Sequence, residues 1–491
     1  MPTSGNVAMR AKRPAGAFAV AILGLVWIGC FIFLNDAYQQ LSFRVGPGLI
    51  SYVDIYVGIL FVYSFVVYLQ RNPGRRIKRI LGTLLISFCG LNLVGILLRN
   101  PLKDIIGDWK RVFGLFAGVG IALIFRNSRF EPEKIASIVF GLIPLLLCSI
   151  AALIRLGAGE DILRTQGLYV SSQVWAPWLP ILLCRSSIRQ SSAFILPVVA
   201  LGVLIMVPSL GTRALAFSIA VSFVGFTLWR LRTGDFKNPD SSPYALKIHH
   251  SKVDPTVADR DHIDNPRKRG WVLHAKRIRK WEAARYQAAL ALILGVVFFL
   301  ALAEIVSLRA HSSYVERFVS RLSPEDPLSK ENITVRIEEI KEMVGGMSTV
   351  NQIVGKGMGG TYYFRFADVR WVASGLYSTP YLPAPHILIA GLFLKGGWLL
   401  FLMGGVLYPL ATIIAFLSGL LRKDRVYLVT LAPYDLAILA TFAFFYTSCQ
   451  FDVMTLLSFS LILALKSFAA DKTTSTWPNR QYRPPWLGTQ S

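Results

Sequence analysis

Long apolar runs separated by short polar segments dominate the chain. A bilayer core needs about 20 consecutive apolar residues per helix, because no water is present there to satisfy the backbone. By this measure the sequence predicts about twelve transmembrane helices, and an even number places both termini on one side. The fold class is therefore an all-α polytopic membrane protein. The predicted spans are residues 15–34, 50–69, 80–98, 109–125, 135–154, 167–184, 192–207, 210–229, 286–304, 398–421, 426–446 and 452–465.

Two long polar segments interrupt this pattern and divide the chain. The first is a basic inner loop, and the second is a large outer loop with short helices of its own. The predicted segments are 1–229 (helices one to eight), 230–285 (inner loop), 286–304 (helix nine), 305–397 (outer loop), 398–466 (helices ten to twelve) and 467–491 (tail).

Composition and charge agree with a membrane protein. Apolar residues make up 54% and charged residues 16% of the chain, against roughly 25% charged in an average soluble domain. These values exclude a soluble enzyme, a secreted disulfide scaffold and a disordered chain. The formal net charge of +24 would by itself favour a nucleic-acid partner. However, about +22 falls on the side of the N-terminus and about +2 on the opposite side, as the positive-inside rule requires. We therefore expect cytoplasmic termini and no nucleic acid.

The inner loop 230–285 has two interpretations. It is either a solvated linker or, over residues 271–285, a basic helix on anionic lipid headgroups. Its four histidines have no zinc-site spacing, and no cysteine pair in the chain has C-x-x-C spacing. The sequence predicts no metal site.

The outer segment 305–397 carries the candidate chemistry. Residues 331–343 have the periodicity of an amphipathic helix, with apolar side chains at Ile333, Ile337, Ile340 and Val344. The glycine-rich stretch 354–360 that follows indicates either backbone amides for a phosphate or a tight turn, and it fits neither the P-loop nor the dinucleotide pattern. The aromatic residues beyond it form either an interfacial belt or platforms for sugar rings. They include Tyr362, Tyr363, Trp371, Tyr377 and Tyr381.

Two single residues stand out on the predicted outer side. His386 opens a short apolar helix, 386–395, that Gly396-Gly397 interrupts, and an imidazole there is either structural or a base for a hydroxyl proton. Arg213 begins an apolar helix, where it either reaches the lipid headgroups or binds phosphate oxygens.

The order of these features resembles the bacterial O-antigen ligase and O-antigen polymerase superfamily. The resemblance covers roughly residues 160–400 and includes the twelve-span topology. The family often has His-Asn where this chain has His386-Ile387. The matching segments are Ser209-Leu210-Gly211-Thr212-Arg213-Ala214-Leu215-Ala216, Thr334-Val335-Arg336, Ile353-Val354-Gly355-Lys356-Gly357-Met358-Gly359, Pro385-His386-Ile387-Leu388 and Leu394-Lys395-Gly396-Gly397-Trp398.

The resemblance implies glycosyl transfer on the periplasmic side of the bacterial inner membrane, inverting and without metal or cofactor. The donor would be a glycan on undecaprenyl diphosphate. The acceptor would be a sugar hydroxyl, on lipid A–core for a ligase or on another lipid-linked glycan for a polymerase. His386 would orient or deprotonate that hydroxyl, and arginines would meet the charge of the diphosphate. The implied cations are Arg213 and Arg336, with Lys110, Arg111 and Arg164 as helpers, and Trp371, Tyr377 and Tyr381 could bind sugar.

Two other classes of function compete with this one. Twelve spans also suit a transporter or flippase of lipid-linked glycans, although the chain shows no internal symmetry. The third hypothesis is a sensor or scaffold built on the basic inner loop. It leaves the outer arginines and histidine unexplained.

Overall fold

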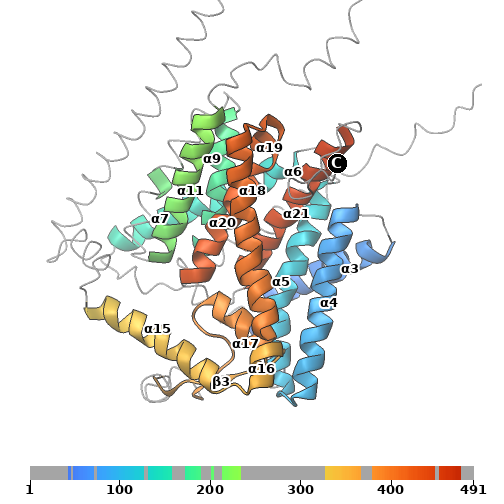
Figure 1. Ribbon diagram of the computed structural model, residues 1–491, viewed down its shortest axis with the longest axis vertical. Coiled ribbons are helices and arrows are strands. Elements are labelled where there is room, and N and C mark those ends of the chain that lie inside the picture. The colour runs from blue at the N-terminus through green and yellow to red at the C-terminus, as the bar shows by residue number, and fades with distance from the viewer. Residues whose placement is uncertain are drawn as a thin grey trace, which may run out of the picture.

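The protein is a bundle of helices with connecting segments at two opposite ends (Figure 1). Apart from two small antiparallel sheets, β1 (Ser42–Val45) with β2 (Gly48–Ser51) and β3 (Tyr362–Tyr363) with β4 (Tyr381–Leu382), the described elements are helical. This agrees with the predicted all-α class. The computed structural model describes residues 42–45, 48–70, 74–126, 131–157, 172–188, 199, 201–203, 213–233, 327–366, 379–447 and 453–476.

Helix α5 (Leu102–Arg126) is central to one half of the core. It packs against α3 (Tyr52–Gln70) on one side and α21 (Val453–Thr476) on another. Small residues permit this contact, since a Cβ at Gly118 would lie 2.2 Å from the carbonyl oxygen of Leu457. Close approach of this kind is the usual way in which membrane helices associate, because lipid offers no hydrophobic driving force between them.

The other half of the core surrounds α20 (Ala432–Thr447). This helix packs against α11 (Arg213–Thr233) and α9 (Leu179–Ile188). Two buried tryptophans join parts of this core through their indole N–H groups. The Trp178 indole donates to the Ser458 hydroxyl at 2.8 Å, and the Trp229 indole donates to the Leu428 carbonyl at 2.7 Å.

Five described helices are long and apolar enough to cross a membrane. The part of the chain that the structure describes thus supports a membrane protein without establishing twelve spans, and the predicted spans 15–34 and 286–304 lie outside it, as does most of 192–207. The five candidate spans are Arg75–Leu97, Pro132–Ile150, Ala214–Thr233, Leu388–Arg422 and Val453–Asp471.

Two segments differ from the sequence prediction near the C-terminus. The span predicted at 398–421 begins ten residues earlier, because α17 (Leu388–Leu400), η7 (Phe401–Leu407) and α18 (Tyr408–Arg422) follow one another without a loop. The predicted interruption at the glycine pair is present as a kink, since Gly397 has φ 59° and ψ −156°. The last helix, α21, continues beyond the predicted boundary at residue 466 to Thr476.

Basic residues gather at one end of the bundle, which we call the basic end. The start of α4 (Arg75–Leu97) meets the end of α21 there, where Arg76 lies 3.2 Å from Asp471. The Arg126 guanidinium lies 5.1 Å from the ring centre of Phe468 at the same end. The turn between α18 and α19 (Arg425–Thr430) adds further cations, and Figure 1 shows it at the top.

The opposite end, which we call the loop end, holds α15 (Pro327–Gly345), α16 (Thr349–Val354) and the β3–β4 sheet (Figure 1). Helix α15 confirms the helix predicted at 331–343. Ile340 and Val344 of the predicted apolar stripe pack against a buried cluster, but Ile337 is 49% exposed, and the buried face also includes Glu339, which is 1% exposed. A buried carboxylate on this face requires polar partners, and it leads to the candidate site.

Candidate functional site

The Glu339 carboxylate organises a cluster of polar side chains at the loop end. One of its oxygens, Oε1, lies 2.9 Å from Nδ1 of His386 and also accepts the Tyr362 hydroxyl. Its other oxygen accepts the His386 backbone N–H at 3.4 Å. A proton on Nδ1 donated to Glu339 gives the tautomer in which Nε2 carries the lone pair. This is the base-and-orienter arrangement that hydroxyl activation requires.

His386 itself is half-buried and precedes the short helix instead of opening it. Helix α17 begins at Leu388, and its N-cap Ile387 is extended. The prediction of a histidine on this helix is therefore wrong. The contacts of the His386 backbone and ring with Glu339 explain the difference, because they fix the residue before the helical turn begins.

Arg336 lies one turn before Glu339 on α15, so both side chains share one side of the helix. Its guanidinium donates to the carbonyl of Thr447, the last residue of α20. Cations near a helix C-terminus stabilise the unsatisfied carbonyls there. The structure thus brings Arg336 and His386 to one neighbourhood, and it also gives Arg336 a structural contact.

The glycine-rich stretch is a tight turn, which excludes a phosphate cradle made of its amides. Gly355, Gly357 and Gly359 all have positive φ, where residues other than glycine are strained. The amides are occupied by protein acceptors: Lys356 N–H donates to Leu394 O at 2.7 Å, and Met358 N–H donates to Leu91 O at 2.9 Å. The turn is therefore wedged between α4 and α17.

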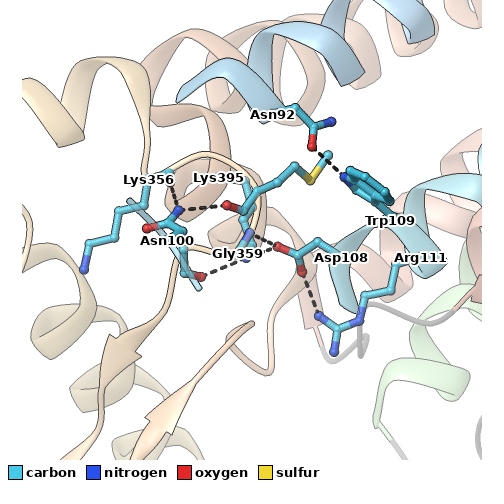
Figure 2. Close-up of polar contacts among 10 residues, drawn as sticks. Asn92, Asn100, Asp108, Trp109, Arg111, Lys356, Gly359 and Lys395 are labelled. Atoms are coloured by element: carbon cyan, nitrogen blue, oxygen red, sulfur yellow. Dashed lines mark hydrogen bonds and ion pairs between the residues drawn. The ribbon is translucent and has the colours of Figure 1, made fainter. Parts of the chain in front are cut away.

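A buried ion cluster fastens this turn to α5 (Figure 2). The Lys395 ammonium binds Asp108 Oδ2 and donates to Gly360 O at 2.8 Å, and both charged side chains are almost fully buried. Gly359 N–H also donates to Asp108 Oδ2, at 2.7 Å, and Arg111 lies 3.2 Å from Oδ1. Sequence reasoning missed this cluster. The available signal was a lysine within an apolar run, since such a charge is costly without a partner.

The Asn100 side chain completes the attachment of the turn. Its Nδ2 donates to the carbonyls of Lys356 and Met358 at 2.7 and 2.8 Å (Figure 2). Four segments therefore hold the turn: α4, α5, α17 and the 98–101 connection. This leaves the Lys356 side chain on the open side of the turn, where its ammonium donates to Thr361 O at 2.9 Å.

An open cavity of about 700 Å³ lies on that side. Pockets of roughly 300–1,000 Å³ accommodate small ligands. Tyr381 was predicted to bind sugar and lies in the cavity wall, 57% exposed. Its ring stands edge-to-face with Tyr363 at 5.7 Å. The lining also includes Asn100, Glu342, Lys356, Tyr362 and Arg365.

The remaining predicted residues fall into two groups. Some are cations that already contact a carboxylate, and the others lie outside the described part of the chain. Lys110 pairs with Asp54 at 3.0 Å, and Arg111 lies 3.2 Å from Asp108, which also binds Lys395, so both predicted cations already contact a carboxylate. Arg213 is the first residue of α11, and its side chain lies outside what the structure describes. The same holds for the whole of Arg164, Trp371 and Tyr377.

Sequence reasoning also missed Glu339, although it placed the helix that carries it. The only local signal was an acidic residue three positions after Arg336. Comparison of the chain with protein-family models, curated proteins and solved structures finds no match.

Proposed function

We propose that this protein is a membrane glycosyltransferase of the O-antigen ligase type. It transfers a glycan from undecaprenyl diphosphate to a sugar hydroxyl on the periplasmic face of the bacterial inner membrane. The observation that carries the proposal is the contact of His386 with the buried Glu339 carboxylate, next to a cavity lined by tyrosines and two cations. The order of motifs that resembles the ligase and polymerase superfamily supports it as well.

The proposed reaction is a single displacement. The acceptor hydroxyl oxygen bonds to the anomeric carbon as the bond from that carbon to the diphosphate oxygen breaks. The hydroxyl proton passes to Nε2 of His386, and Glu339 stabilises the imidazolium that forms. Undecaprenyl diphosphate leaves with the bonding electrons, and Arg213 and Arg336 compensate its charge. The diphosphate is already an activated leaving group, so this step needs no cofactor.

The acceptor distinguishes a ligase from a polymerase, since both enzymes catalyse the same bond change. We test the function by deleting the gene in the source bacterium and restoring it with variants expressed at equal levels. With a ligase, deletion leaves long chains on undecaprenyl diphosphate; with a polymerase, it leaves single repeats on the acceptor lipid. Lipid-linked glycan confined to the cytoplasmic face would instead indicate a flippase and contradict the proposal.

Variants test the roles of individual side chains. We expect His386→Ala, Arg213→Ala and Arg336→Ala to abolish transfer, and Glu339→Gln to lower it by about 10²-fold, the usual contribution of general-base catalysis. Glu338→Gln is the matched control, because the neighbouring Glu338 side chain is exposed. His311→Ala, which removes another histidine of the predicted outer segment, should also leave transfer intact. Full transfer by His386→Ala would refute its catalytic assignment.

A further inference from the structure

The cavity at the loop end has a defined chemistry of its own. We infer that it binds the acceptor as an anionic saccharide, a sugar that carries a carboxylate or phosphate group. The role as acceptor site rests on the proposed function, whereas the preference for an anionic sugar rests on the cavity alone.

Charge is the first argument. Two cationic side chains, Lys356 and Arg365, line the cavity, against one carboxylate, Glu342. That carboxylate is already engaged, because its Oε2 accepts the Arg365 backbone N–H at 2.8 Å. The cations therefore exceed the acids in the lining, and a guanidinium suits the paired oxygens of a carboxylate or phosphate.

The surroundings of the Lys356 ammonium group also favour an anionic ligand. Partial burial lowers the pKa of its ammonium group. The ammonium group donates to a neutral carbonyl oxygen, Thr361 O, at 2.9 Å. A negative charge in the cavity would offset the loss of solvation and favour the ammonium form.

Shape and aromatic lining point to a sugar. The Tyr363 and Tyr381 rings stand on adjacent strands at the cavity wall and are 43% and 57% exposed. Rings in this position offer an apolar face for a sugar and a hydroxyl group as a polar handle. An inorganic ion would need neither the rings nor a volume of about 700 Å³.

Tyr362 connects this cavity with the proposed base. It lines the cavity, and its hydroxyl donates to the same Glu339 oxygen that lies 2.9 Å from the His386 ring. A saccharide in the cavity thus lies beside Tyr362 and would extend past this side chain to bring a hydroxyl to the base. The acceptor is the substrate whose hydroxyl must reach that base.

Calorimetric titration of the full chain in phosphatidylcholine nanodiscs tests the inference. Trigalacturonate is the anionic probe and maltotriose the neutral one. We expect trigalacturonate to bind at least about 10-fold more tightly, and the Lys356→Gln/Arg365→Gln double variant to lose about 10-fold in its affinity. Lys341→Gln removes an exposed cation outside the cavity and should change nothing. Equal affinity for both probes, or unchanged binding by the double variant, would overturn the inference.

A second titration separates a saccharide from a lipid headgroup as the source of the anion. Nanodiscs that contain phosphatidylglycerol should leave trigalacturonate affinity within about twofold of its value in phosphatidylcholine. Loss of trigalacturonate binding in these nanodiscs would assign the cavity to headgroups and overturn the inference. A failure of the proposed function gives a different result from a failure of this inference. Full transfer by His386→Ala would refute the proposed chemistry, whereas the tighter binding of the anionic sugar would remain.

Discussion

At the scale of single residues, the contribution of a charged group to stability depends on whether its ion pair is buried or exposed to water. Asp108 and Lys395 are 4% and 5% exposed, whereas the side chains of the Arg76–Asp471 pair at the basic end are 42% and 36% exposed. A buried charge that loses its partner keeps its desolvation cost, but an exposed charge regains water. The two pairs should therefore respond very differently to the same substitution.

Asp108→Asn should destabilise the protein by about 3–5 kcal/mol, because it leaves the Lys395 ammonium buried without a counter-charge. Thermal unfolding in detergent measures the effect. The matched control is Asp471→Asn, for which we expect about 0–1 kcal/mol. The double variant Asp108→Asn/Lys395→Met should recover part of the loss. Equal effects of Asp108→Asn and Asp471→Asn would contradict a structural role for the buried cluster.

At the scale of elements, the glycine-rich turn acts as a wedge between helices. Gly357 has φ 68°, and a Cβ added to it would lie 2.3 Å from the backbone nitrogen of Gly95 on α4. Neither atom belongs to a flexible side chain, so the turn or the helix would have to move. The turn carries Lys356 at the cavity and contacts α17, and its displacement should therefore disturb the site.

Gly357→Ala is expected to cost at least about 2 kcal/mol, from its left-handed conformation and the collision with α4. It should also reduce glycan transfer. Gly90→Ala on α4 is the control, because open space surrounds a Cβ there and alanine is favoured within a helix. Thermal unfolding and transfer are measured on both variants. If the Gly357→Ala protein were as stable and active as Gly90→Ala, the close packing of the turn against α4 would not be required.

At the scale of the whole molecule, the two ends of the bundle differ in charge and in chemistry. The start of α4 and the end of α18 bring basic residues to one end, while Glu339, His386 and the cavity occupy the other. Positive residues favour the cytoplasmic side. We therefore expect the proposed reaction on the far side of the membrane.

Cysteine labelling of intact cells tests this orientation. Lys341→Cys lies on α15 at the loop end, and Arg422→Cys ends α18 at the basic end; both native side chains are exposed. A membrane-impermeant maleimide should label the former in intact cells and both after permeabilisation, with the parent chain as background. The reverse pattern would place the site in the cytoplasm and contradict the proposed function.

The sequence alone determined the helical class, the presence of apolar helices long enough to cross a membrane and the clustering of basic residues. It could do so because apolar length and charge are local properties, read along one segment at a time. His386 and Tyr381 drew attention by their residue types, and Arg336 by the motif resemblance.

Only the tertiary structure decided which groups meet. Asp108 and Lys395 belong to helices far apart in sequence, and Glu339 was one acid among several on an amphipathic helix. The glycine-rich stretch was ambiguous for the same reason, because the role of its amides depends on the acceptors they face. A local pattern specifies which side chains are available, but contacts between distant segments depend on how the helices pack.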